Sequence, residues 1–378
     1  MGINEKLIQL YAAQINGLKD ICDKSELITA TETYSKWDGP ILMHCWEQDY
    51  NNAAFKILFI GQEPNTWIDR AWDEVERPLE RYEKFALAEN KKDKTTFWKA
   101  IFDINNFINS GDQNSKQFLW TNVSKYSTWE GKRINDTDFN FINQRLNLLQ
   151  EEIKIVNPNA IIFFSGPDYD QWIKSQFNGN ISFDEPLLQN ISTRELCLVK
   201  LDTENLILPV HTYRTYHPNY LNQKKKWYFL NAIVLDFMGF NLENIVKKLK
   251  DDFSHLKHVI IDDVEISNYF GNKEFTLKVK VSQWENFSIG FQFEENVFCS
   301  FFYGILNDKE VENEKILVQI NSLQDNNEKS SELWPFWNWY EQKNWSKKTF
   351  EEIQSGEFII KIQRIIDNIL ERTKGWDM

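Results

Sequence analysis

The chain has 378 residues, of which 42% are hydrophobic and 26% charged, a composition that excludes a disordered protein and allows more than one core. Its formal net charge of −13 excludes a protein that coats nucleic acid non-specifically, because phosphate binding depends on Lys and Arg, although a local basic groove stays open. The four cysteines are scattered with no CxxC pair, which excludes a zinc ribbon or an iron–sulfur cluster. Lone cysteines fit a reducing cytosol, and no apolar run is long enough to span a membrane, so we expect a cytoplasmic protein.

Short apolar runs alternate with helical patterns through the first 238 residues. Such a run, bounded by turn residues, is typical of a strand buried on both faces of a parallel sheet. Residues 97–108 and 139–156 carry apolar residues at helical spacing, and residues 179–185 are predicted as a loop. The pattern predicts an α/β fold in which helices flank a central four-stranded parallel sheet, with strands at residues 56–60, 118–124, 160–164 and 206–210.

The sequence changes character near Gly239, where alternating apolar and polar residues begin to predominate. Alternation is typical of antiparallel strands with one solvated face. We therefore predict a first domain at residues 1–238 and a smaller α+β accessory or interaction domain at 245–378. Its mainly antiparallel strands are expected at residues 259–266, 274–281, 287–293, 297–305 and 315–320, followed by a closing helix at 347–374.

An aromatic cluster, WPFWNWY, occupies residues 334–340 of the second domain. Three interpretations stay open for it: a platform on which bases stack, a face that binds a protein partner, and a core cluster that packs against the last helix. A nuclease site in this domain is disfavoured, because Glu274 and Lys278 are spaced too widely for the Glu-x-Lys pattern that it requires.

Three polar loops follow strands of the predicted parallel sheet. The first is Gly61-Gln62-Glu63-Pro64-Asn65, the second begins at Asn122, and the third begins at His217. Because parallel strands end at one edge of a sheet, and ligands of open α/β sheets bind at that edge, we expect the three loops to meet in one site.

The three loops together resemble the uracil-DNA glycosylase superfamily. Its first motif, Gly-Gln-Asp-Pro-Tyr in the best-known branch, is similar to residues 61–65 here, and its second, His-Pro-Ser-Pro-Leu-Ser, is similar to residues 217–222 (HPNYLN). An Asn at the end of a middle strand corresponds to Asn122. The order and strand contexts agree, and the resemblance covers about residues 1–238. It implies a four-stranded parallel sheet, DNA as partner, base flipping and a DNA repair activity.

The resemblance implies a role for each matched residue. Glu63, where the family has Asp, would orient a water and stabilise the sugar cation, and His217 would donate a hydrogen bond to the departing base anion. Asn122 would pair with the edge of the base, and Asn65 would lie beside it. Gln62 would hold the phosphate or the base through its backbone. Leu221 matches the wedge residue that fills the gap left by the flipped base. Asn219 and Asn222 match serines that contact phosphate. Positive charge beside the wedge would come from Lys224 and Lys225, followed by Lys226.

Each of these residues also has a structural interpretation. Glu63 and Asn122 can cap helices or following segments, His217 can be a turn residue, and Leu221 can belong to the core. A run of lysines is more often a solvated helix face than a binding patch.

Two departures from the family pattern bear on the substrate. Glu63 is one methylene longer than Asp, so its contact with water or sugar must shift. The Tyr that excludes thymine by crowding its methyl group is Asn65 here, which opens the site to bulkier 5-substituted pyrimidines. The aromatic residue that stacks on the base is not identified by the motifs; Trp67, Trp72 and Tyr82 are the candidates.

Two functions from different classes follow. The first, which the residues favour, is a DNA glycosylase that hydrolyses the N-glycosidic bond of uracil or a modified pyrimidine in DNA; a non-host base as substrate would make it a phage-defence enzyme. The second is a catalytically silent module of the same fold that binds DNA, modified bases or a protein partner. Neither requires a metal or an organic cofactor, and neither involves a membrane.

Overall fold

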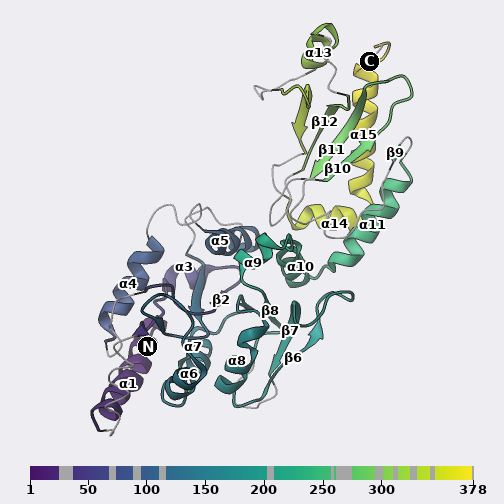
Figure 1. The fold of residues 1–378 in the computed structure, drawn as a ribbon. Coiled ribbons are helices and arrows are strands. Elements are labelled where there is room, and N and C mark those ends of the chain that lie inside the picture. Colours follow the sequence, from purple (N-terminus) through teal and green to yellow (C-terminus); the bar gives the residue numbers. More distant parts are fainter. Residues whose placement is uncertain are drawn as a thin grey trace. The chain divides into compact units, whose positions relative to one another are not determined.

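The computed structural model describes residues 1–24, 37–67, 74–87, 95–109, 116–201, 208–256, 259–260, 275–293, 301–309, 314–323, 330–340 and 345–376. The chain forms two compact units, Met1–Leu221 and Asn222–Met378 (Figure 1). The domain boundary expected between residues 238 and 245 stays a prediction.

The first unit is built on a six-stranded sheet with the strand order β3-β2-β5-β8-β7-β6. The first four strands run parallel, and β7 and β6 extend the sheet as antiparallel strands. The expected α/β fold with four parallel strands is therefore confirmed. The strands are β2 (Ile57–Gly61), β3 (Phe118–Asn122), β5 (Ala160–Phe163), β6 (Ile181–Pro186), β7 (Leu196–Leu201) and β8 (His211–Thr215), and a separate two-stranded ribbon joins β1 (Trp37–Asp38) to β4 (Ser127–Thr128).

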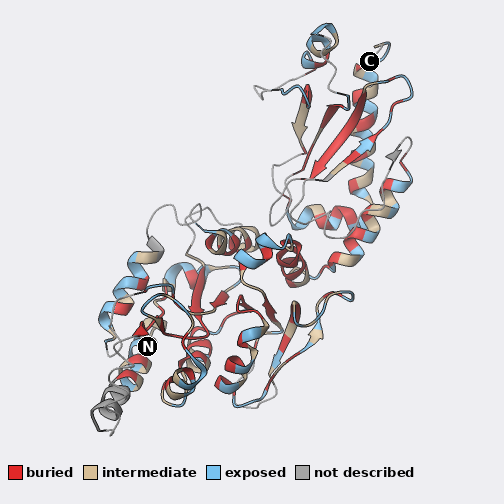
Figure 2. Ribbon diagram, in the orientation of Figure 1, coloured by how far each residue is buried: buried red, intermediate tan, exposed pale blue. Residues whose placement is uncertain are grey.

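The central strands are buried along their whole length, as their apolar sequences require. Every residue of β2, β3 and β5 is buried (Figure 2). Helices flank the sheet, and α1 contacts α7. The helices are α1 (Ile3–Lys24), α3 (Glu47–Asn52), α4 (Glu76–Leu87), α5 (Thr96–Asn109), α6 (Asp136–Asn143), α7 (Leu148–Val156), α8 (Asp170–Gln176) and α9 (Pro218–Gln223), with the short 3-10 helix η1 (Pro167–Tyr169).

The fourth parallel strand lies later than expected. Residues 206–210 were predicted as a strand because they are apolar, but β8 is formed by His211–Thr215, and the described residues 208–210 are not in a strand. Pro209 lacks the N–H that a central strand needs. Polar β8 is stabilised instead by Arg214, whose guanidinium binds Asp170 at 3.1 Å and the carbonyl oxygens of Thr193 and Arg194 at 2.8 and 2.7 Å.

The loop predicted at residues 179–185 is largely strand. Residues from Ile181 onward form β6, which pairs with β7 in an antiparallel hairpin. Ile181 and Phe183 alternate with less buried neighbours, which is the pattern of an edge strand with one covered face. The flanking Asn and Gly residues obscured this short pattern in the sequence.

The second unit contains a five-stranded antiparallel sheet with the order β13-β12-β11-β10-β9, as expected for an α+β unit. Its elements are α10 (Tyr228–Phe237), α11 (Leu242–Ser254), β9 (Val259–Ile260), β10 (Phe275–Val279), β11 (Phe287–Phe293), β12 (Phe301–Asn307), α13 (Glu314–Asn321), β13 (Phe336–Trp339), α14 (Lys347–Ser355) and α15 (Glu357–Arg372). The remainders of the strands predicted at 259–266 and 297–305 lie outside the described residues.

Two predictions for this unit are wrong. Residues 315–320, predicted as a strand, belong to helix α13, because a short apolar run fits either structure. The single closing helix at 347–374 is two helices, α14 and α15, separated by Gly356, which adopts a positive φ of 80°. Glycine at that conformation ends a helix without steric cost, so the chain turns there.

The aromatic cluster at residues 334–340 is mostly core. Trp334, Phe336 and Tyr340 are buried, while Trp337 and Trp339 are half-buried and pack against Phe302. Among the described residues, no single helix is long and apolar enough to cross a membrane; α10 and α11 reach the required length and composition only as a pair, and the chain bends by 102° between them.

Candidate active site

The loops that the sequence singled out leave the carboxyl ends of neighbouring parallel strands. Gly61 and Asn122 are register partners at the ends of β2 and β3, and β5 separates β2 from β8 in the sheet. His217 follows β8 by two residues. The sheet therefore brings the first motif, Asn122 at the end of edge strand β3, and the second motif to the same side of the sheet.

Gly61 and Asn122 are in close contact. A Cβ built on Gly61 would overlap Asn122 Oδ1, so only glycine leaves room for this amide. Asn122 is 6% exposed, and the amide N–H groups of Val123 and Ser124 donate to the carbonyl oxygens of Gly61 and Gln62 at 2.9 Å each. These bonds tie the two loops together, and the close contact with Gly61 restricts where the Asn122 side chain can lie.

Gln62 joins the site to a third strand. Its side-chain Nε2 donates to the carbonyl oxygen of Ser165 at 2.9 Å, and Ser165 follows β5. The side-chain amide of Gln62 therefore holds the loop to the end of β5, while its carbonyl oxygen accepts from Ser124; its predicted contact with a ligand through the backbone stays a prediction.

Glu63 is half-buried and has a specific partner. The hydroxyl of Tyr169, at the end of η1, donates to Glu63 Oε2. Burial raises the pKa of Glu63 above its ordinary value of 4.5, while the Tyr169 hydrogen bond and the positive charge of Arg133 oppose that rise. The site thus combines desolvation of a carboxylate with two groups that favour its ionised form.

His217 is held as a neutral imidazole. Burial lowers its pKa to about 4, and its Nδ1 accepts a hydrogen bond from the backbone N–H of Asn219 at 3.3 Å. Because Nδ1 is the acceptor, the ring proton is assigned to Nε2. His217 therefore offers an N–H donor without a positive charge.

Phe97, which the sequence did not single out, contacts both motifs. Its ring stacks on that of His217 with a centroid distance of 5.1 Å and an interplanar angle of 9°, and its Cζ would lie 3.5 Å from a Cβ on Gly61. No motif marks Phe97, because helix α5 delivers it from outside the three loops; its place in the apolar pattern of α5 was the only signal.

The aromatic residues considered for base stacking lie elsewhere. Trp67 is 6% exposed and packs edge-on against Trp120, while Tyr82 is fully buried and stacks on Trp120 at 3.7 Å. Trp72 lies outside the described residues. Trp67 and Tyr82 are buried, whereas the ring of Phe97, which stacks on His217, is half-buried.

Other predicted contact residues are placed as follows. Leu221 is fully buried, so it does not present a protruding side chain, and its predicted wedge role has no support from its position. Its neighbour Tyr220 is 36% exposed and packs against Tyr216 at 4.3 Å. The predicted residues that lie on the exposed surface are Asn65, Asn219, Asn222, Lys224 and Lys225.

Asn65, the residue that replaces the family Tyr, points toward a turn. Its Oδ1 lies so close to Gly131 that a Cβ there would be 2.5 Å away. Gly131 has a positive φ of 72° in the turn that follows β4. A glycine at this position therefore accommodates the Asn65 amide.

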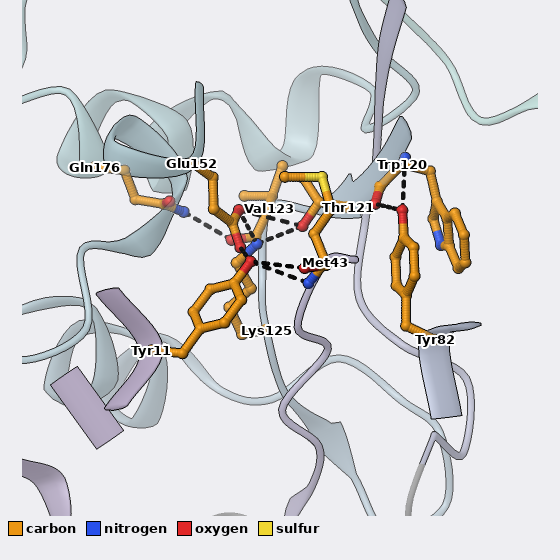
Figure 3. Close-up of polar contacts among 9 residues, drawn as sticks. All are labelled: Tyr11, Met43, Tyr82, Trp120, Thr121, Val123, Lys125, Glu152 and Gln176. Atoms are coloured by element: carbon orange, nitrogen blue, oxygen red, sulfur yellow. Dashed lines mark hydrogen bonds and ion pairs between the residues drawn. The ribbon is translucent and has the colours of Figure 1, made fainter. Parts of the chain in front are cut away.

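A buried polar network lies behind the loop that follows Asn122 (Figure 3). Lys125, 5% exposed, forms an ion pair with fully buried Glu152 of α7 and donates to the hydroxyl of Thr121. Tyr11 of α1 donates to the other carboxylate oxygen of Glu152 at 2.9 Å, and its hydroxyl accepts the N–H of Met43 at 3.0 Å. The network thereby connects α1, α7 and the carboxyl end of β3.

The described residues contain no group of three or more His, Cys, Asp or Glu side chains positioned to hold a metal ion. Burial raises the pKa of the described thiols, Cys45 and Cys197, to about 12 each, so both are protonated at neutral pH. The Glu63 carboxylate, the Asn122 amide and the His217 imidazole are three polar groups in the loops at the sheet edge.

The family comparison agrees with this arrangement. The family model described as the uracil DNA glycosylase superfamily matches residues 48–234, a segment that contains the four parallel strands and all three loops. No curated protein and no solved structure gives a significant match to the chain. A glycosylase-like function and a DNA ligand are what this family suggests for the matched segment. Residues 48–234 of this chain belong to the uracil DNA glycosylase superfamily.

Proposed function

We propose that the protein is a DNA glycosylase that hydrolyses the N-glycosidic bond of uracil or a modified pyrimidine in DNA. The observation that supports this most is the meeting of Glu63, Asn122 and His217 at one sheet edge, each in a state suited to a different part of the reaction. A family match without these side chains would support the fold alone.

The proposed reaction begins with a nucleotide extruded from the stack, because the bond is inaccessible inside a duplex. The Asn122 amide, with one acceptor and two donors, pairs with the base edge, and Phe97 supplies an apolar ring against which the base lies. The close contact of Asn122 with Gly61 restricts where the amide can lie before the base arrives.

Bond cleavage then separates charge. The C1′–N bond breaks and its electron pair leaves with the base, while the sugar becomes an oxocarbenium ion. Nε2–H of neutral His217 donates to the base oxygen on which the negative charge develops. Glu63 stabilises the cation and accepts a proton from the water whose oxygen bonds to C1′. Glu63 must be ionised for this, so base release is lost as pH falls through its raised pKa.

Asn65 bears on the choice of base. In the resemblance it stands where a Tyr crowds the 5-methyl group of thymine, and here the shorter amide is exposed and rests against Gly131. The position therefore supports the acceptance of pyrimidines with a substituent at carbon 5. A substrate of that kind, absent from host DNA, would give the enzyme a role in defence against phage.

Base release from oligonucleotides tests this function. Single- and double-stranded DNA would carry uracil, 5-hydroxymethyluracil, glucosylated hydroxymethylcytosine or, for comparison, thymine, and abasic sites would be cleaved with alkali. We expect cleavage at one or more of these bases and a loss of about 10²–10⁴-fold in Glu63→Gln, the range of a removed general base. Binding without cleavage of any substrate would favour the catalytically silent module instead.

Gly61→Ala is expected to reduce kcat/KM for base release by about 100-fold, because a displacement of a reacting or positioning group by about 1 Å costs that much. The new Cβ would overlap Asn122 Oδ1, so the amide must move. Gly179→Ala is the matched control: it strains a positive φ of 79° but meets no atom within 4 Å. Equal activity of Gly61→Ala and wild type would show that Asn122 is not positioned by this contact.

A further inference from the structure

We propose that Tyr169 is the positioning residue of Glu63, and that Arg133 and Trp172 hold Tyr169 in place, so that the longer carboxylate side chain can do the work of an Asp. This inference rests on the proposed function, since it concerns the residue that would orient water. It assigns a task to residues that belong to neither sequence motif.

The contact between Tyr169 and Glu63 is built from neighbouring strands. Glu63 follows β2, Tyr169 ends η1 after β5, and β2 pairs with β5 in the sheet. Tyr169 is 4% exposed and donates its hydroxyl to Glu63 Oε2. Among the described residues no hydrogen bond reaches Oε1, so this second oxygen remains available to hold a water.

Tyr169 is itself fixed by a cation. The guanidinium carbon of Arg133 lies 4.6 Å from the ring centre of Tyr169 and 4.0 Å from that of Trp172. Arg133 also donates to the carbonyl oxygen of Asp168 at 3.2 Å and to Asp136 Oδ1 at 3.3 Å. Cation–π contacts and charge-assisted hydrogen bonds thus determine where the Tyr169 ring lies.

Trp172 completes the support. Its Nε1 donates to Asp136 Oδ1 at 2.8 Å, and its ring stacks on Phe139 of α6 at 3.9 Å with an interplanar angle of 6°. The Tyr169 ring meets the Trp172 ring edge-on at 5.3 Å. The chain of contacts therefore runs from the helices α6 and α8 to the Glu63 carboxylate.

A longer side chain explains why such an anchor is useful. Glu has one more rotatable bond than Asp, and each ordered rotamer-rich side chain costs conformational entropy. A hydrogen bond from a rigid ring selects one carboxylate position before substrate binds, which is the preorganisation that a water-orienting group requires. An Asp at residue 63 would end one methylene short of the Tyr169 hydroxyl.

The same groups influence the ionisation of Glu63. Burial raises its pKa, and Tyr169 and Arg133, the titratable or charged groups that act on it from η1 and from the segment before α6, lower it. Asp136 Oδ1 accepts from Arg133 and from Trp172. Asp168 accepts from Arg133 through its carbonyl oxygen, its carboxylate pairs with Arg194 at 3.8 Å, and its charge contributes to the raised pKa of Tyr169. Burial and the neighbouring carboxylate raise the pKa of Tyr169, so its hydroxyl keeps its proton as a donor at neutral and moderately alkaline pH.

Tyr169→Phe removes the hydroxyl and keeps the ring. We expect kcat for base release to fall about 10- to 100-fold with little change in KM, the range of a hydrogen bond to a charged group. The acid limb of the pH–rate profile should move to higher pH, because a group that lowers the pKa of Glu63 is lost. Tyr213→Phe is the control: it removes another buried hydroxyl, bonded to His211 at the opposite end of β8, and should leave kcat and the pH profile unchanged.

A double-mutant cycle with Glu63→Asp separates positioning from general destabilisation. If the hydroxyl acts through the longer carboxylate, Tyr169→Phe should lose most of its effect in the Glu63→Asp background, where the shorter side chain does not reach it. Equal effects in both backgrounds would mean that Tyr169 supports the fold alone, and the proposal would be rejected.

A titration without substrate keeps the two proposals apart. In protein labelled with ¹³C at Glu carboxyl carbons, the Glu63 signal is identified by its disappearance in Glu63→Gln, and its pKa is expected to rise in Tyr169→Phe and not in Tyr213→Phe. If wild type releases no base while this shift occurs, the anchor stands and the proposed reaction fails. If base release depends on Glu63 but Tyr169→Phe matches wild type in rate, profile and titration, the reaction stands and the anchor fails.

Discussion

Glu152→Ala is expected to lower the free energy of unfolding by about 3–5 kcal/mol, the cost of removing one partner from a buried ion pair. The Lys125 amine is 5% exposed and would keep a buried charge without its counterion, while Tyr11 and Thr121 would lose a shared acceptor. Urea denaturation followed by tryptophan fluorescence would measure the change. Truncation of both partners, in Lys125→Met with Glu152→Leu, should recover most of the loss, because no charge is then left buried.

The neighbouring residue on the same helix provides the control. Glu151 is 44% exposed and pairs with Lys154 on the surface at 2.6 Å, so Glu151→Ala should cost no more than about 1 kcal/mol. Equal denaturation midpoints for Glu151→Ala and Glu152→Ala would contradict the buried pair.

The pH dependence of this effect has a defined sign. Burial lowers the pKa of Lys125 in the folded protein, and loss of the Glu152 charge would lower it further. Between the pKa of Lys125 in the folded protein and its higher pKa in the unfolded chain, the unfolded state binds more protons than the folded state. Over that pH range the free energy of unfolding therefore rises with pH. The deficit of Glu152→Ala relative to wild type should therefore shrink as pH rises toward about 10, near the ordinary pKa of lysine.

His217→Ala is expected to slow base release by about 10²–10³-fold, the effect of removing one donor from a developing anion. The loss should appear in kcat, because the charge on the base develops only as the bond breaks. The pKa of His217 is about 4, so the ring is neutral over the working range, and the loss should be constant from pH 6 to 8. Rates at substrate saturation would be measured across that range.

His211→Ala is the matched control for this prediction. His211 begins the same strand at the opposite edge of the sheet, where it contacts the Tyr213 hydroxyl at 3.0 Å. Its removal should affect stability more than kcat. If His217→Ala released base as fast as His211→Ala, an anion-stabilising role for His217 would be wrong.

The sequence was sufficient for the parallel core and for the meeting of the three loops, because both depend on strand order and on the edge where strands end. It was misleading where a polar strand is held by tertiary contacts. Residues 206–210 are more apolar than β8, and the polar segment is stabilised as a central strand by the contacts of Arg214 with Asp170 and with the carbonyl oxygens of Thr193 and Arg194. Pro209 was the one local signal against the apolar choice.

The site could be predicted only as far as its motifs. Phe97 and Tyr169 reach it from a helix and from the segment after β5, and neither has a spacing pattern that connects it to Glu63 or His217. Leu221 is the reverse case, a residue that the motif singled out but that does not reach the surface. Its place in the second motif suggested an exposed wedge, while its packing buries it completely. Alignment of a motif with a family fixes the order of residues along the chain, and the packing of this chain decides which of them reach the surface.

The contact between Gly61 and Asn122 has a consequence for protein engineering. The Asn122 side chain already fills the space beside Gly61, where a Cβ would overlap its Oδ1, so a larger residue at position 122 has little room on that side. The amide proposed to pair with the base is therefore a poor starting point for a variant library. Asn65 is exposed and lies against Gly131, which has no side chain to be displaced when residue 65 is exchanged. Selection for altered base preference would therefore begin by randomising residue 65.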